Sequence, residues 1–229
     1  RYKIKNDLSL TVNLFFLSLI SLILILQPDF GMFFLISAVW LIQLLAINIK
    51  SKILFPVISV IILVFLLCIF FIDHVRFRIM NYFFSNIGDN YQIMKSLDSF
   101  KSGGLLGQGI GEGVVSKRLP DSHSDFIYAL ISEELGIIVA LFILFLYLFI
   151  YIRVNYICQK SSNLFIITSL TGLSNLLFFQ TIINISSTLN IIPTKGMTLP
   201  FISYGGSSLV SCALIVGFIL VLIKETKNE

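Results

Sequence analysis

The run PTKGMTLPFISYGGSS, residues 193–208, is polar, carries a single cation and lies between two long apolar segments. Its two prolines and three glycines interrupt the regular backbone hydrogen bonding of a helix. Unpaired N–H and C=O groups each cost several kcal/mol in hydrocarbon, so irregular backbone of this kind does not face lipid. The run therefore predicts a segment that lies at a membrane surface or lines a wet cavity enclosed by protein.

The composition on both sides of this run is that of a membrane protein. Apolar residues make up 57% of the 229 residues, charged residues only 12%, and the mean hydropathy is +0.96, whereas a typical soluble domain is about 25% charged. We therefore predict an all-α fold, a polytopic transmembrane helix bundle forming a single integral membrane domain. Six segments are long and apolar enough to cross about 30 Å of hydrocarbon: 10–27, 30–48, 53–72, 126–152, 163–189 and 207–223.

Basic residues set the expected orientation of this bundle. They gather on alternate connections, at 1–5, 50–52, 153–160 and 224–227, and the positive-inside rule places such connections in the cytoplasm. An even number of spans then puts both ends in the cytoplasm and the long connection 73–125 outside. That connection nevertheless carries six basic residues, which suggests an anionic ligand outside, although a basic, solvated loop explains them equally well. Because the sequence starts at Arg1 without a signal-peptide pattern, we expect the C-terminal part of a longer protein.

Several functional classes are disfavoured by the remaining composition. The three cysteines are odd in number and fall in or at the ends of predicted spans, so they indicate no disulfide framework. The two histidines have no zinc-type spacing, so no transition-metal site is predicted. Basic residues are spread along the chain, which does not favour nucleic-acid binding. The glycine-rich segment 103–113 breaks the dinucleotide fingerprint at Glu112 and follows no strand, so it predicts a flexible or tightly turning loop over a cleft.

Asp125, at the start of the fourth predicted span, is the main candidate for chemistry. The segment Ser122-His123-Ser124-Asp125 has the form of a capping box, in which Asp125 would only reach back to the start of the helix. The alternative is a general base at the mouth of a membrane cavity. A helix N-terminus favours the ionised carboxylate, whereas burial near lipid disfavours it.

Six further polar residues are candidates for the site or for structural roles. Continuous helix geometry puts Glu133 about 80° around from Asp125 and Glu134 on the opposite side, so Glu133 is expected to face the same cavity and Glu134 to pair with a basic residue elsewhere. Lys195 is either a snorkelling anchor or an anion contact. Gln180 and Asn184 share a helix face, which either forms hydrogen bonds to neighbouring helices or lines a substrate groove. Asp29, in the tight turn QPDFG at 27–31, is expected to be a turn former.

Short motifs occur in order along nearly the whole chain: QPDFG at 27–31, Arg76 and Arg78 before Ile79, YQI at 91–93, SGGLLG at 102–107 with Gly109, LPDSHSDF at 119–126, EELG at 133–136, and the run 193–208. Taken together and at this spacing, they make the chain resemble the SEDS family of bacterial cell-wall polymerases. The lysine in PTKG, together with Gly111-Glu112-Gly113 and Pro120-Asp121-Ser122-His123, is more similar to the division branch of that family than to its elongation branch.

The resemblance implies a ten-span enzyme of which this chain is the last six spans. It implies a peptidoglycan glycosyltransferase that polymerises lipid II, with Asp125 as the general base for the acceptor 4-hydroxyl. The resemblance and the outer-side charge together suggest substrate contacts from Lys195, Arg76, Arg78, Lys117, Arg118, His123, Glu133 and Ser207. No cofactor is certain, and a divalent cation remains open.

The same resemblance suggests where the protein acts and with what. It implies a location in the inner membrane at the division septum, alongside membrane lipid, a class B penicillin-binding transpeptidase and other divisome proteins, with no nucleic acid. A lipid II flippase, an elongation-type polymerase and a non-catalytic divisome scaffold are the alternatives.

Overall fold

The computed structural model describes residues 7–47, 49, 51–84 and 91–227. These residues form eight α-helices and one short 3-10 helix and contain no strand, so the predicted all-α class is confirmed. The elements are α1 Asp7–Leu26, α2 Phe30–Ala46, α3 Ser51–Phe71, α4 Asp73–Phe84, α5 Tyr91–Gly103, η2 Ser116–Arg118, α6 Ile127–Cys158, α7 Leu164–Thr188 and α8 Gly206–Thr226.

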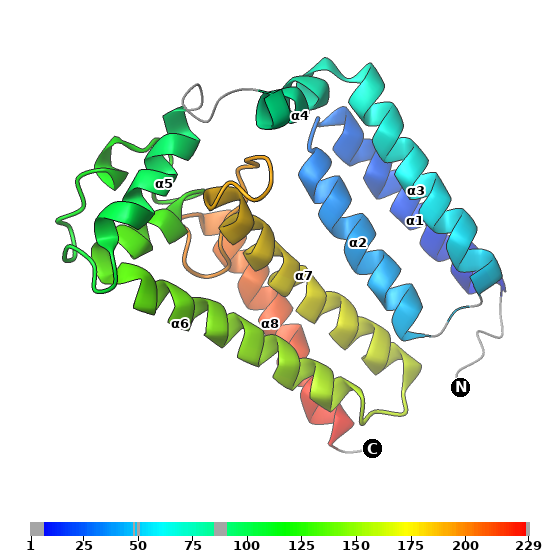
Figure 1. Ribbon diagram of the computed structural model, residues 1–229. Helices are drawn as coiled ribbons and strands as arrows, with labels where there is room; N and C mark the ends of the chain where they lie inside the picture. Colours follow the sequence, from blue (N-terminus) through cyan, green and yellow to red (C-terminus); the bar gives the residue numbers. More distant parts are fainter. Residues whose placement is uncertain (1–6, 48, 50, 85–90, 228–229) are drawn as a thin grey trace.

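The long helices run side by side in a tilted bundle (Figure 1). Helix α7 packs against α2 on one side and against α6 and α8 on the other, whereas α3 packs chiefly on α4 and only lightly on α2. Helices α4 and α5 lie at one end of the bundle together with the loop between α7 and α8, and we call this the loop end. The first turn of α1 and the last turn of α8 lie at the opposite end (Figure 1).

The protein is a multi-pass membrane protein. Four helical segments among the described residues are long and apolar enough to cross a bilayer, namely Leu54–Phe71, Ile127–Cys158, Leu164–Thr188 and Gly206–Thr226. Two shorter apolar helices, Val12–Leu26 and Phe30–Ala46, accompany them. All six predicted segments are therefore helical, and the crossing of the membrane by the two shorter ones remains a prediction. Large apolar side chains cover the outward faces of α3, α6 and α8, as expected of surfaces in contact with lipid.

Helix α7 owes its central place to small and polar side chains. Its buried face carries Thr171, Ser174, Asn175, Thr181 and Asn184, which would be costly against lipid. These side chains bond to backbone within α7 and to neighbouring helices, as where the Tyr151 hydroxyl of α6 donates to Asn175 Oδ1 at 3.2 Å. Hydrogen bonds between polar groups, in addition to apolar packing, therefore hold the helices of this bundle together.

Helix α6 is broken at Gly136, whose φ of 86° and ψ of 167° are non-helical. The predicted span 126–152 therefore needs correction, because the helix is interrupted early and ends only at Cys158. The part after the break, 137–158, extends about 33 Å at 1.5 Å per residue, which by itself matches the hydrocarbon thickness. The part before the break, 127–135, is a separate segment at the loop end of the bundle.

The glycine-rich loop after α5 fills this break. Its backbone pairs with helix groups that the break leaves without intrahelical partners, so the interrupted helix keeps its hydrogen bonds. An ideal Cβ added to Gly107 would lie 2.3 Å from the Glu134 carbonyl oxygen, so only glycine allows the loop to approach this closely. The tight turning predicted from so much glycine is thus confirmed, whereas the predicted position of the loop over a cleft stays a prediction. The bonds are Gln108 N to Glu133 O at 2.9 Å, Gly109 N to Glu134 O at 3.0 Å and Ile137 N to Gly104 O at 3.0 Å.

Candidate functional site

The loop between α7 and α8 is bonded to the turn that precedes α6. Buried Asn184 of α7 donates from Nδ2 to two backbone carbonyls, Asp125 O at 2.9 Å and Met197 O at 2.5 Å. The Ser203 hydroxyl donates to Ser124 O at 2.5 Å, and Tyr204 N donates to His123 O at 2.9 Å. These bonds hold Asp125 beside the run 193–208. Asn184 therefore joins separate segments by hydrogen bonds, which is one of the two roles predicted for it.

Asp125 lies in a turn, two residues before α6 begins. Its backbone N–H donates to Asp121 O at 3.0 Å, and Ser124 and Phe126 donate to the same carbonyl. The residue that caps α6 is Phe126, with no side-chain capping bond. The capping-box interpretation was therefore wrong: the turn at 121–126 is closed by backbone bonds to Asp121 O, which leaves the Asp125 carboxylate out of the cap.

The Asp125 carboxylate is half-buried and faces the backbone of Gly196. An ideal Cβ on Gly196 would lie 2.9 Å from Oδ2 of Asp125, and Gly196 has a φ of 37° that favours glycine. Among the described residues, none donates a hydrogen bond to this carboxylate. Burial raises the pKa of Asp125 above its ordinary value, and the charge of Asp121 raises it further. A raised pKa and a half-buried position are typical of a carboxylate that acts as a general base.

Lys195, next to Gly196, lies in a cavity of about 690 Å³ that has both polar and apolar walls. Its Nζ is 2.9 Å from Oδ1 of Asp29, which sits in the turn between α1 and α2. Burial lowers the pKa of Lys195; the hydrogen bond and charge of Asp29 oppose this shift, and Arg78 adds to it. The cavity lies between the α1–α2 turn, α7 and the start of α8. It is lined by Gln27, Pro28, Asp29, Met32, Arg78, Leu176, Gln180, Lys195, Gly196, Met197, Thr198, Ser207, Ser208, Ser211, Cys212 and Ile215.

Two other predicted contacts line this cavity, Arg78 and Ser207. Gln180 also lines it, and its Nε2 donates to Thr198 O at 3.0 Å, so this side chain is both interhelical glue and part of a groove. Asp29 has more than the predicted turn role, because it also pairs with Lys195. Sequence reasoning left this pair undetected, since nothing in either motif indicates that the two turns meet.

Three predicted cationic contacts lie elsewhere. Arg76 is exposed on α4 and does not line the cavity, because a spacing of two residues turns it to a different helix face from Arg78. Lys117 and Arg118 lie in η2, beside α5, and are also absent from the cavity. The Lys117 Nζ donates to Gly111 O at 2.6 Å, which closes the glycine-rich loop.

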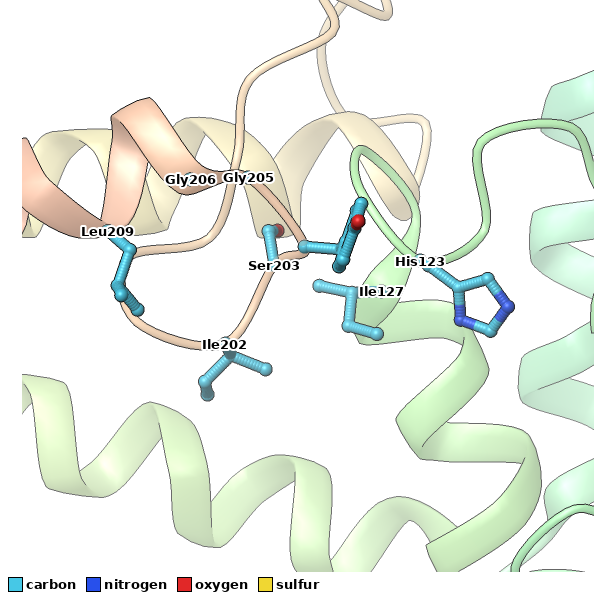
Figure 2. A pocket seen from close by; sticks show the side chains of 8 residues that line it. His123, Ile127, Ile202, Ser203, Gly205, Gly206 and Leu209 are labelled. Carbon is cyan, nitrogen blue, oxygen red and sulfur yellow. The ribbon is translucent and has the colours of Figure 1, made fainter.

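His123 lines a second, more apolar cavity of about 620 Å³. Figure 2 shows its imidazole on one side of this cavity and Leu209 on the other, with Ile202 and Ser203 between them. The side chain is exposed. His123 is thus a neighbour of Asp125 in sequence that opens into a different cavity from Lys195.

Glu133 is fully buried, and its carboxylate accepts hydrogen bonds from three backbone N–H groups. Oε1 accepts from Val114 N at 3.0 Å and from Val115 N at 2.9 Å, and Oε2 accepts from Ser116 N at 2.7 Å. The expectation that Glu133 faces the same cavity as Asp125 is therefore wrong, and the contact of Glu133 with substrate stays a prediction. That expectation assumed one continuous helix from Asp125, whereas the helix starts at Ile127 and Glu133 points at the loop that follows Gly113. The salt bridge predicted for Glu134 is not found among the described residues.

We expect Glu133→Gln to loosen this loop, because an amide presents an N–H to one of the three backbone donors. Losing a bond to a charged acceptor and leaving a buried donor unpaired costs about 1–3 kcal/mol. The exposed residues Lys117 and Arg118 follow directly, so trypsin should cleave there several times faster than in the parent protein. Glu112→Gln, at an exposed position of the same loop, is the matched control. Equal cleavage rates for the parent and Glu133→Gln would contradict the assigned role.

No three His, Cys, Asp or Glu side chains in the described part of the chain gather in a way that could hold a metal ion. The fold and the site together define an all-helical, multi-pass membrane protein that presents one half-buried carboxylate beside a cationic cavity at the loop end of the bundle.

The chain belongs to the family of cell cycle proteins FtsW, RodA and SpoVE, whose family model matches residues 2–228. The predicted SEDS resemblance is thereby confirmed. A protein of Caulobacter vibrioides, described as "Probable peptidoglycan glycosyltransferase FtsW", is 41% identical over 156 residues, which are 68% of this chain and 40% of that protein. A protein of Coxiella burnetii with the same description is 35% identical over 220 residues, or 92% of this chain and 58% of that protein.

A solved structure shares the fold over the whole chain, with a TM-score of 0.75 at 20% identity, and the chain covers 66% of it. That structure is described as "Structural coordination of polymerization and crosslinking by a peptidoglycan synthase complex". The chain thus spans about two fifths to three fifths of the two relatives above and about two thirds of this structural neighbour.

Proposed function

We propose that this chain is the site-bearing part of a peptidoglycan glycosyltransferase that polymerises lipid II into glycan strands during cell division. The observation that carries the proposal is the placement of the half-buried Asp125 carboxylate against Gly196. The residue before Gly196 is Lys195, which lines the cavity of about 690 Å³. A base and a cation on adjacent parts of one surface are what a glycosyl transfer from a diphosphate donor requires. The description of the relatives as probable FtsW glycosyltransferases supports the same activity.

In the proposed reaction, the ionised carboxylate of Asp125 takes the proton of the acceptor sugar's 4-hydroxyl. The freed oxygen forms the new glycosidic bond to the anomeric carbon of the donor, and the bond from that carbon to the diphosphate oxygen breaks. The diphosphate leaves with the electron pair of that bond, which adds one negative charge to the two that it already carries. Lys195 and Arg78 line the cavity that adjoins Gly196, and their charge stabilises the leaving group.

The loop end of the bundle would then face the outside of the cytoplasmic membrane, with both ends of the chain in the cytoplasm. The alternation of basic connections supports this orientation. We place the protein at the division septum, with a class B transpeptidase and other divisome proteins as partners, because the relatives are FtsW proteins and the structural neighbour belongs to a peptidoglycan synthase complex.

The test is the polymerisation of purified lipid II by the full-length protein with its transpeptidase, comparing the parent with Asp125→Asn. Glycan strands from the parent and none from the variant would support the proposal. Lipid II movement across vesicles without polymer would indicate a flippase instead, and growth of cells that carry Asp125→Ala would indicate a scaffold.

The acid side of the pH profile offers a second test. Asp125 acts as a base only when it is ionised, so activity should fall as the pH drops through its raised pKa. The variant Asp121→Asn removes a charge that raises this pKa, and the acid limb should therefore move to lower pH. Asp121 has a φ of 56°, which Asn adopts readily, so the turn is expected to survive. An acid limb that does not move would contradict the assignment of Asp125 as the base.

A further inference from the structure

Lys195 and Arg78 lie where two cavities meet. Both residues line the cavity with mixed walls described above, and both also line a more apolar cavity of about 320 Å³. The apolar cavity lies between α2, α3, α4 and the segment after α7, with walls that include Phe30, Phe34 and Phe65. A pair of cations between a partly polar and a more apolar space suits an amphiphile with an anionic head group and a hydrocarbon chain.

The ammonium of Lys195 is covered in this arrangement. Its side chain crosses the first turn of α2, where an ideal Cβ on Gly31 would lie 1.7 Å from its Cδ. Its Nζ is buried and lies 2.9 Å from Oδ1 of Asp29. Because the Asp29 carboxylate occupies a position beside Nζ, a phosphate oxygen that binds there would take its place.

Asp29 is well placed for such an exchange. Its side chain is 41% exposed, whereas that of Lys195 is 14% exposed, so the carboxylate has solvent to move into. The same Oδ1 accepts a bond from Met32 N at 3.1 Å and so caps α2. Asn caps helices about as well as Asp. The charge of residue 29 can therefore be removed while the cap is kept.

We propose that Lys195 and Arg78 bind the diphosphate of a lipid-linked ligand, and that Asp29 is an exchangeable counter-ion that occupies Lys195 until the ligand phosphate replaces it. The inference rests on the proposed function, because a glycosyl donor linked to a lipid diphosphate is the ligand that the function requires. In the empty site, Asp29 neutralises a charge that would otherwise be buried alone. In the occupied site, the ligand supplies the negative charge.

The charged groups that face Lys195 set the expected pH dependence. They are Asp29 from the α1–α2 turn and Arg78 from α4, and Asp125 lies against the neighbouring residue Gly196. Asp29 favours the charged lysine and Arg78 opposes it. Removing the charge of Asp29 should therefore strengthen anion binding at any pH at which Lys195 is charged. Without Asp29, Lys195 should also lose its proton at a lower pH, so the alkaline limit of anion binding should move to lower pH.

The experiment measures binding to the full-length protein in detergent, with farnesyl diphosphate and inorganic pyrophosphate as probes. Asp29→Asn should bind farnesyl diphosphate on the order of fivefold more tightly than the parent near pH 6.5, the size of effect typical for one partly exposed ion pair. Lys195→Gln should lose most of the binding. Asp98→Asn is the matched control, because it removes the acid of a surface Lys–Asp pair, Lys95 with Asp98 at 3.7 Å, and it should bind as the parent does.

Three results would overturn the inference. The first is equal or weaker binding by Asp29→Asn near pH 6.5 in protein whose thermal unfolding matches the parent. The second is equal affinity for farnesyl diphosphate and pyrophosphate, which would show that no lipid chain is recognised. The third is an alkaline limit of binding that does not move in Asp29→Asn.

This measurement needs no turnover, so its failure is separate from failure of the proposed function. Polymerisation that survives in Asp125→Asn would refute the base while leaving the binding result intact. An Asp29→Asn protein that binds no better, in an enzyme that still depends on Asp125, would refute the counter-ion alone.

Discussion

Replacing Asp125 with Asn is expected to reduce glycan polymerisation by about 10²–10⁴-fold, the usual contribution of a positioned general base. Asn keeps the size of the side chain, and its backbone can still donate to Asp121 O and accept from Asn184. The loss should appear in the rate of strand synthesis on gels of labelled lipid II, with lipid II binding retained.

The stability of this variant should change in the opposite direction. Burial raises the pKa of Asp125 in the folded protein, so the folded state holds its proton more tightly than the unfolded state does. Between the unfolded and folded pKa values, stability from this group falls as the pH rises, and at neutral pH the ionised carboxylate is unfavourable. Asp125→Asn should therefore unfold at the same temperature as the parent or a higher one. Asp98→Asn serves as the surface control, and an inactive Asp125→Asn protein that is also less stable would point to a structural role.

Replacing Gly136 with Ala is expected to have the largest effect on folding. An ideal Cβ there would lie 2.3 Å from Leu105 O and 2.6 Å from Gly107 N, both backbone atoms that cannot turn aside. The φ of 86° adds strain for any residue with a side chain. Together these effects should cost about 3 kcal/mol or more, which we expect to see as little folded protein after membrane extraction, judged by size-exclusion chromatography and thermal unfolding.

The matched control is Gly217→Ala in α8, where an added Cβ meets nothing within 4 Å. Ala is a better helix former than Gly, so this variant should be as stable as the parent or slightly more stable. If Gly136→Ala were also tolerated, the break in α6 would not depend on the approach of the glycine-rich loop.

The sequence predicts the helices of this protein well and their contacts poorly. Long apolar segments can only form helices in a bilayer, so the six helical segments follow from hydropathy, and four of them are long enough to span. Helix α5 was missed because it is short and polar, although its apolar positions Ile93, Leu97 and Phe100 have helical spacing.

Single residues of the candidate site could be predicted from the sequence, but contacts between distant segments could not. Asp125 and Lys195 stand out as ionisable residues at the edges of apolar runs. The pairing of Lys195 with Asp29 depends on the packing of α2 against α7, which no local pattern encodes. Glu133 was misplaced because its orientation depends on a break in α6, and that break depends on glycines in a different loop.

The way the glycine-rich loop completes α6 has a consequence for biosynthesis. The backbone groups that Gly136 leaves unpaired find their partners at residues 104–109, which precede α6 in the chain. Translation proceeds from the N-terminus, so the ribosome has already released these partners when the broken helix enters the bilayer. The nascent chain can thus satisfy the interruption as soon as it is made, without waiting for α7 and α8. A circular permutant that placed residues 91–113 after α8 would lose this order. When its α6 enters the membrane, the backbone N–H and C=O groups at the break would have no hydrogen-bond partners.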